Sequence, residues 1–380
     1  MVIFIKVKNT TLNNLIRQTN GNPIIKEIDG LRAIAIIAVL LSHFNLCVVK
    51  LNELDETFLY SNPLSRFLEL CGNGVSIFFC ISAFILSIPF IKYYLYNGEK
   101  VSLKKYYIRR ITRLHVPYLL VLTVLWLTQL LLMNEDFRES VPHYFASFFY
   151  SHNIIYGQKS TINPVAWTLE IEIQFYLLLP LLIKIFLIKK TLLRRIFILS
   201  IVLLAGILYA YFNDWFIAHH LQFSIFAYLP VFGIGFLLAD LYLSYYKKTT
   251  EYKQIWLDAF VPLGFALIIY CNGDTRLYMQ LLEYAGYILL FAGVFYGRIF
   301  NTLFTKKWIM LIGCMCYSIY LLHYAILYFI MNKFSIQFIQ HNYYYDLLLQ
   351  ALIVLPIVFV VCTLFYKWIE LPFARRKTRP

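Results

Sequence analysis

The sequence predicts an all-α polytopic integral membrane protein, and three observations support this fold class. Hydrophobic residues make up 61% of the 380 residues, charged residues only 14%, and the mean hydropathy is +0.67. Apolar segments long enough to cross a bilayer, about 20 residues each, recur along the chain. Clusters of basic residues alternate with acidic or neutral loops. A water-soluble globule of this composition would expose large apolar areas, so the lipid bilayer is the expected solvent.

About ten transmembrane helices are predicted. Clusters of Lys and Arg, as in 100–113 and 189–195, are expected on the cytoplasmic side, and the acidic loops 53–56 and 135–139 on the outer side. Both termini should therefore be cytoplasmic. The expected spans are 30–49, 73–95, 114–133, 164–188, 196–212, 220–243, 255–271, 277–297, 308–331 and 346–368.

The predicted organisation is one transmembrane domain over 27–373, between a cytoplasmic N-terminal tail, 1–26, and a basic cytoplasmic tail, 374–380. The net charge of +14 would suggest a nucleic-acid partner in a soluble domain. Here the basic residues follow the expected membrane topology, so we expect the bilayer as a partner and no nucleic acid. The seven cysteines lie mostly within apolar runs, which predicts small buried side chains rather than a disulfide framework.

Arg32 and His43 are ionisable residues within the first predicted span. They are eleven positions apart, so both lie on one helix face, roughly 16 Å apart along the axis. Ionisable side chains in hydrocarbon usually face a protein interior and carry function. Arg32 also has an ordinary explanation, snorkelling to the cytoplasmic surface, and His43 has one as a packed core residue. Asp29 is interpreted as a helix cap rather than a catalytic group.

Three further groups of residues contain charged or polar side chains, and burial of such side chains in a membrane is costly in free energy. Arginines at the mouth of the third span suit phosphate groups, because a guanidinium binds phosphate in a bidentate manner. A carboxylate beside an aromatic ring, at the start of the fourth span, suits a sugar. A histidine and a tyrosine three residues apart share one face of the ninth span. The residues are Arg109, Arg110 and Arg113; Trp167, Glu170, Glu172 and Tyr176; and Tyr320 and His323.

These residues resemble the acyltransferase 3 family of membrane acyltransferases, which includes bacterial O-acetylases of surface polysaccharides. The resemblance covers about residues 26–373, with the motifs in the expected order. One departure is Ala83, where the family usually has glycine, and the effect is confined to close helix packing. The matching segments are Asp29-Gly30-Leu31-Arg32 with His43, Gly74 to Phe84, Arg109 to Tyr118, Trp167 to Tyr176, Tyr317 to His323, and Glu370-x-Pro372.

The resemblance implies transfer of an acyl group, commonly acetyl from cytoplasmic acetyl-CoA, to a hydroxyl of a sugar, polysaccharide or glycolipid. It also implies a multi-pass protein of the plasma (inner) membrane, with acyl-CoA as co-substrate, no permanently bound cofactor and no metal site. His43 is the expected general base or acyl relay, and Arg32 orients it or holds the donor. The other implied roles are catalytic for Glu172, CoA phosphate binding for Arg109, Arg110 and Arg113, and acceptor binding for Trp167, Tyr176 and His323.

Two other classes of function remain open at this point. A transporter that exports a sugar, acid or lipid would also suit many spans with buried charge. A structural partner of a polysaccharide assembly complex is the third interpretation, ranked last because the motif residues are intact. The sequence leaves open the acyl group, the acceptor hydroxyl, direct transfer or relay, and whether the chain forms a homodimer.

Overall fold

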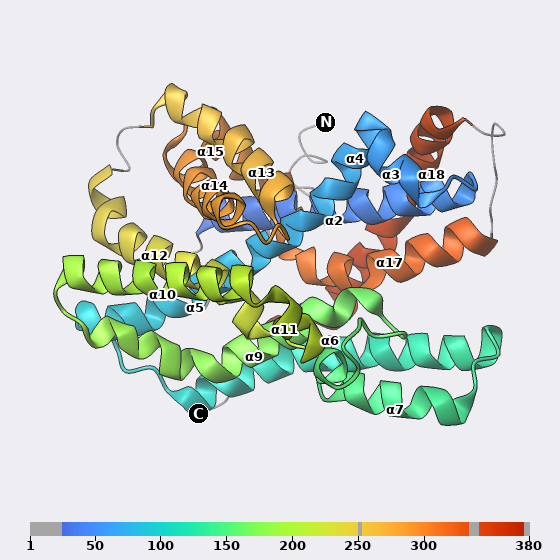
Figure 1. Cartoon of the computed structure of the whole chain (residues 1–380), viewed down its shortest axis with the longest axis horizontal. Helices are drawn as coiled ribbons and strands as arrows, with labels where there is room; N and C mark the ends of the chain where they lie inside the picture. Colours follow the sequence, from blue (N-terminus) through green and yellow to red (C-terminus); the bar gives the residue numbers. More distant parts are fainter. Residues whose placement is uncertain (1–24, 250–252, 334–341, 376–380) are drawn as a thin grey trace, which may run out of the picture. The chain divides into compact units, whose positions relative to one another are not determined.

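A computed structural model describes residues 25–249, 253–333 and 342–375 (Figure 1). The secondary-structure elements in these ranges are all helices. The all-α prediction is confirmed. Most of the predicted tails, 1–24 and 376–380, lies outside the described residues. The helices form two compact units, each described here by itself. Unit 1 contains the described residues up to Val75 and those from Gly297 onward, and unit 2 contains Ser76–Tyr296.

Unit 1 is built around one long helix, α2, against which the later helices of the chain pack. Its elements are α2 (Lys26–Leu51), α3 (Glu56–Ser61), α4 (Pro63–Leu70), the 3₁₀ turn η1 (Cys71–Val75), α15 (Ile299–Phe304), α16 (Lys307–Cys314), α17 (Cys316–Lys333), α18 (Tyr343–Phe365), the π-helical turn η5 (Tyr366–Glu370) and α19 (Leu371–Arg375).

Unit 2 contains several long helices, with two pairs, α5 with α12 and α13 with α14, in extensive contact. Its elements are α5 (Ser76–Leu95), α6 (Leu103–Leu132), α7 (Phe137–Phe148), α8 (His152–Tyr156), η2 (Pro164–Ala166), α9 (Trp167–Leu182), η3 (Ile183–Leu187), α10 (Thr191–Tyr211), α11 (Asn213–Ala218), α12 (Ile225–Thr249), η4 (Ile255–Ala259), α13 (Phe260–Cys271) and α14 (Leu277–Tyr296).

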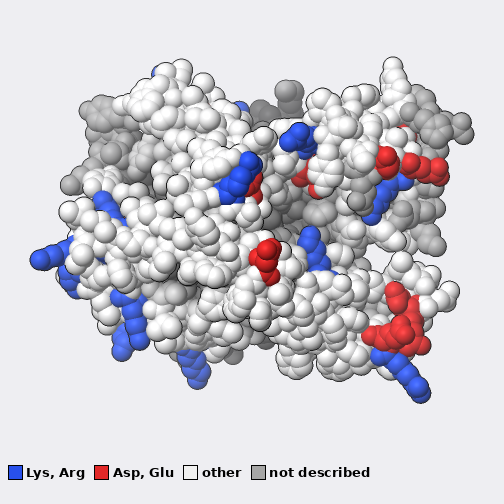
Figure 2. All heavy atoms as spheres, viewed as in Figure 1, with Lys and Arg blue, Asp and Glu red and all other residues white. Residues whose placement is uncertain are grey.

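Each of the ten predicted spans corresponds to a helical segment, but the segments are not equally long. Among the described residues, seven helices are long and apolar enough to cross a membrane, and an eighth span results if α16 and α17, bent by 67°, are counted together. Helices α9 and Ile255–Cys271 are shorter. Uncharged side chains cover most of the face drawn in Figure 2, as expected for a surface that meets lipid. The protein is a polytopic membrane protein.

Helix α2 begins earlier than the sequence suggested. It starts at Lys26, with Ile25 at the N-cap and no side-chain cap, so Asp29 lies inside the first turn and the capping prediction is wrong. The first turn is instead fixed by close packing. A Cβ atom on Gly313 of α16 would lie 1.8 Å from the backbone oxygen of Asp29, so only glycine permits this approach of the two helices.

The helices pack closely at Ala83 in unit 2, although glycine is replaced there. A Cβ on Gly235 of α12 would lie 2.5 Å from the Cβ of Ala83 on α5, and equally close to the backbone oxygen of Cys80. The glycine that permits close packing therefore stands on the facing helix. A small residue on each side lets the two backbones approach, as is common between membrane helices.

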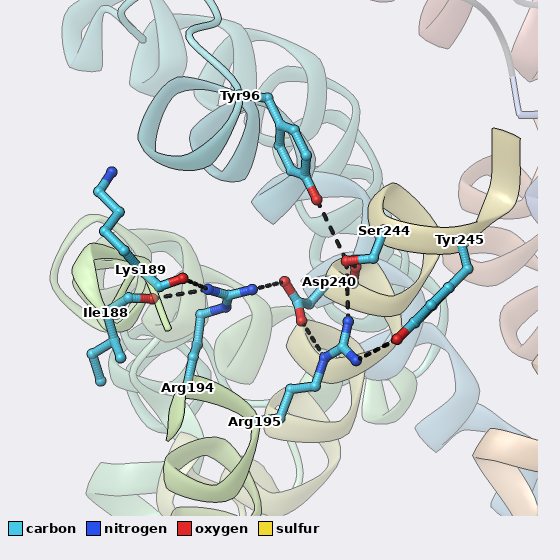
Figure 3. A network of polar contacts seen from close by, with 8 residues as sticks. All are labelled: Tyr96, Ile188, Lys189, Arg194, Arg195, Asp240, Ser244 and Tyr245. Atoms are coloured by element: carbon cyan, nitrogen blue, oxygen red, sulfur yellow. Dashed lines mark hydrogen bonds and ion pairs between the residues drawn. The ribbon is translucent and has the colours of Figure 1, made fainter. Parts of the chain in front are cut away.

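Two ionic bonds join α10 to α12 inside unit 2 (Figure 3). The carboxylate of Asp240 lies between two guanidinium groups, accepting from Arg194 Nη2 at 2.8 Å and from Arg195 Nε at 2.7 Å. The side chains of Asp240 and Arg194 are 0% and 2% exposed, and that of Arg195 is 17% exposed. Buried charges of this kind require partners, so each of the three side chains depends on the others to be stable in the interior.

The same network includes the end of α5. The hydroxyl of Tyr96, just after α5, lies 3.4 Å from that of Ser244, which also accepts a hydrogen bond from Arg195 (Figure 3). Lys189 donates to the carbonyl oxygen of Tyr94. The basic residues around 189–195 therefore gather at one end of unit 2, where α5 and α12 end and α10 begins. We call this the basic end.

The connection between α6 and α9 forms two helices with a polar interior. His143 Nδ1 lies 2.9 Å from Nε2 of His152, whose Nδ1 lies 3.1 Å from the carbonyl oxygen of Gln158. Burial lowers the pKa of His152. All seven cysteines are free thiols, and six of them are buried, as the prediction of small buried side chains requires.

Candidate active site

Arg32 lies inside unit 1, six residues after the start of α2, which is between one and two helical turns. Its Nη1 donates to Asp29 Oδ1 at 3.1 Å, and its side chain is 14% exposed. Cys314 and Cys316, around the break between α16 and α17, lie close enough to interact with its charge. Arg32 is therefore held by an acidic neighbour and faces protein, which is the interior interpretation that the sequence left open.

His43 meets a second histidine within unit 1. Its Nδ1 lies 3.2 Å from Nε2 of His323 on α17, and the ring centroids are 5.0 Å apart. The ring of Tyr324 lies edge-on to His43, with 5.3 Å between centroids. His323 is fully buried, whereas His43 is partly exposed. The two histidines that the sequence singled out are brought together, although 280 positions separate them.

The backbone around the two rings assigns their tautomers. Nδ1 of His323 lies 2.8 and 2.9 Å from the carbonyl oxygens of Ile319 and Tyr320, which only accept, so this nitrogen carries the proton. Its Nε2 is then an acceptor for His43. Nδ1 of His43 also lies 3.0 Å from the carbonyl oxygen of Val39, which requires a proton on that nitrogen as well. In the neutral pair, Nε2 of His43 therefore carries a basic lone pair.

The start of α17, which carries His323, is fixed by Glu370. One carboxylate oxygen of Glu370 accepts from the backbone N–H of Ser318 at 3.1 Å and from its hydroxyl at 2.6 Å. Both residues are buried. A carboxylate at a helix N-terminus satisfies N–H groups that have no partner within the helix. Two motifs that are 52 positions apart in the sequence thus act together to hold α17.

Glu172 and Tyr176 form the centre of a second group, in unit 2. The Tyr176 hydroxyl donates to Glu172 Oε2 at 2.7 Å, and the hydroxyl of Ser82 on α5 donates to Oε1 at 3.0 Å. The guanidinium carbon of Arg110 on α6 lies 5.9 Å from the centroid of the Tyr176 ring. Glu172 is thus held from two helices, and Tyr176 links it to an arginine.

The three predicted CoA-binding arginines do not share one environment. Arg110 and Arg113 are partly buried on α6, and Arg109 is exposed. Arg110 lies over the Tyr176 ring, and Arg113, three residues further along α6, lies on the same helix face.

Trp167 lies among aromatic rings at the first turn of α9. Its ring centroid is 5.4 Å from that of Phe223, 5.8 Å from that of Tyr228 and 6.4 Å from that of Phe79. Nine residues along α9 separate Trp167 from Tyr176, roughly 13 Å at 1.5 Å per residue. Along α9 the aromatic group comes first, then Glu172, and then Tyr176, whose ring lies under Arg110 of α6.

The fold and these two groups define a polytopic membrane protein with acid–base residues buried in apolar helices. No cluster of three or more potential metal ligands occurs in the part of the chain that the structure describes. A sequence model of the acyltransferase 3 family, an acyltransferase domain, matches residues 25–367. The chain belongs to this family.

The curated relatives are bacterial. The O-acetyltransferase OatA of Staphylococcus aureus strain NCTC 8325 / PS 47 is 27% identical over 376 residues, which cover 92% of this chain and 57% of that protein. A putative O-acetyltransferase of Staphylococcus aureus strain COL is 26% identical over 380 residues, with the same coverage. The chain spans little more than half the length of these relatives. No solved structure matches it.

Proposed function

We propose that this protein is an O-acetyltransferase that moves an acetyl group from acyl-CoA to a hydroxyl of a sugar, polysaccharide or glycolipid, in the plasma membrane. Family membership and the names of the relatives support acyl transfer. The observation that carries the proposal is the hydrogen bond between His43 and His323, because it leaves a basic nitrogen on a histidine within a membrane helix.

His43 is the general base in this proposal. Its Nε2 takes the proton of the acceptor hydroxyl, and the oxygen attacks the thioester carbonyl. The carbon–sulfur bond breaks, CoA leaves as thiolate, and the proton ends on the CoA sulfur. While His43 is positively charged, its Nδ1–H donates to His323 and to the Val39 carbonyl, which stabilises the imidazolium. His323 is thus a positioning residue rather than an acceptor contact.

The arginines of α6 bind the donor in this proposal. Arg110 and Arg113 form phosphate contacts, and exposed Arg109 adds a further cation at the surface. Glu172 and Tyr176 hold Arg110 in place, with Tyr176 serving the donor side. Trp167 remains the proposed contact of the acceptor.

The direct test uses membranes that contain the protein, supplied with labelled acetyl-CoA. We expect release of free CoA thiol together with label in the cell-surface glycan, and neither in membranes that lack the protein. The rival transporter predicts movement of solute without consumption of acetyl-CoA. Folded protein that never releases CoA would contradict the proposal.

His323 should affect the chemical step rather than donor binding. His323→Leu removes the acceptor for His43 Nδ1–H, and a hydrogen bond to a charged group contributes about 1.5–3 kcal/mol, equivalent to roughly a tenfold to hundredfold fall in kcat. The KM for acetyl-CoA should not change. His323→Gln, whose carbonyl oxygen can accept the bond, should restore part of the rate. Equal losses in the two variants would argue for a purely packing role.

A further inference from the structure

Buried carboxylates need partners, and those of unit 1 have them with one exception. A guanidinium, an amide and a hydroxyl donate to the buried carboxylates of Asp29, Glu27 and Glu370, respectively. The exception is Asp346, in the first turn of α18. It is 0% exposed, and neither of its side-chain oxygens has a hydrogen-bond partner among the described residues. The fold therefore leaves a buried carboxylate unsatisfied, which calls for an explanation.

Asp346 belongs to the face of α18 that is turned to the protein interior. Helix α18 packs against α17 and α2 within unit 1. Three residues before Asp346, the Tyr343 hydroxyl donates to Oδ1 of Asn45 on α2 at 2.5 Å. One turn after it, Gln350 is 6% exposed, and from Val354 onward the buried face is apolar. The start of this face is thus a polar region of the interior, with Asp346 between two neutral polar residues.

The position of Asp346 favours its charged form. A negative charge in the first turn of a helix is stabilised by the helix dipole. A proton would remove the charge without satisfying the group, because the hydroxyl of a carboxylic acid also needs an acceptor. Within the part of the chain that the structure describes, no Lys or Arg forms an ion pair with Asp346. A cation from solution is the partner that would satisfy both oxygens.

We propose that Asp346 binds a small monovalent cation, such as sodium, inside unit 1, with the side-chain oxygen of Gln350 as a further ligand. Hard cations take oxygen ligands from carboxylates and amides, and residues four apart share one helix face. One carboxylate balances one positive charge. A divalent ion would require further acidic ligands, and the described residues contain no cluster of three potential metal ligands. This assignment does not depend on the proposed acetyl transfer.

A cation at Asp346 has a structural consequence for α17 and α18. Glu370, which follows α18, already holds the start of α17 through Ser318. The cation would act at the opposite end of α18, by neutralising the buried charge at its first turn. A ligand that binds only the folded state stabilises that state by mass action. Unit 1 should therefore be more stable in sodium than in a cation too large to enter.

The test measures melting of the full-length protein in detergent, in sodium chloride or N-methylglucamine chloride at equal ionic strength. For wild type we expect a saturable rise of about 2–4 °C at a sodium concentration about tenfold above the dissociation constant. Wild type should also retain radioactive sodium. Asp346→Asn should abolish both effects. In N-methylglucamine it should melt at or above the wild-type temperature, because the unpaired buried charge is gone.

Glu53→Gln is the matched control, because Glu53 is an exposed acidic residue of unit 1, and its sodium response should equal that of wild type. Gln350→Leu gives a second measurement should Asp346→Asn fail to fold, and it should require more sodium for the same rise. Equal melting of wild type in the two salts, with no sodium retained, overturns the site. So does a sodium effect that persists in Asp346→Asn, or a stabilisation that follows pH rather than sodium.

Discussion

Replacing His43 with alanine should lower acetyl transfer by roughly 10²–10⁴-fold, the usual contribution of a positioned general base. The structure gives the physical reason. The protons on Nδ1 of both rings are held by backbone carbonyls, so the pair presents one basic nitrogen, Nε2 of His43. Alanine removes that nitrogen and leaves Nε2 of His323 without its donor. The measurement is incorporation of labelled acetyl into glycan by membranes with equal amounts of protein.

The control for this variant is His219→Ala. His219 is exposed just after α11 and stacks on Trp215, so its loss should leave transfer unchanged. Both variants must melt near the wild-type temperature for the comparison to apply. Full acetyl incorporation by folded His43→Ala protein would exclude the base assignment, and with it the positioning role of His323.

Helical periodicity was sufficient to find His43 and Arg32 but not their partners. A period of 3.6 residues gives the face of a helix and nothing about which helix covers that face. The contact with His323 therefore needed the structure, because it joins residues 280 positions apart. Hydropathy has a similar limit: it locates apolar segments but does not show that Cys316 begins a new helix bent 67° from α16.

Some residues were missed although the sequence carries a signal for them. Asp240 lies alone in the apolar run 220–243, and an ionisable residue in such a run marks a partnered site. Arg194 and Arg195 were interpreted only as topogenic charges, yet both bind this carboxylate. Ser82 offers no comparable signal, because a serine is inexpensive to bury, and its bond to Glu172 depends on the packing of α5 beside α9.

The second large effect is expected for stability. Asp240→Asn should cost about 3–5 kcal/mol, because removing one partner of a buried ion pair leaves uncompensated charge in the interior. Arg194, 2% exposed, would lose the one carboxylate that it contacts among the described residues. The value should lie toward the lower limit, since Arg195 is 17% exposed and can be partly solvated. Thermal melting in detergent, followed by tryptophan fluorescence, measures the change.

Asp274→Asn is the control that shows whether the loss of stability in Asp240→Asn comes from the burial of the charges or from the loss of an ion pair as such. Asp274 also pairs with an arginine, Arg276, at 2.6 Å, but both partners of this pair reach solvent, so its loss should leave the melting temperature nearly unchanged. If the Asp240 effect comes from stranded charge, adding Arg194→Met to Asp240→Asn should recover part of the loss, because the second change removes the unpaired cation. A double variant that melts at the sum of the two single losses would instead mean that the residues act independently.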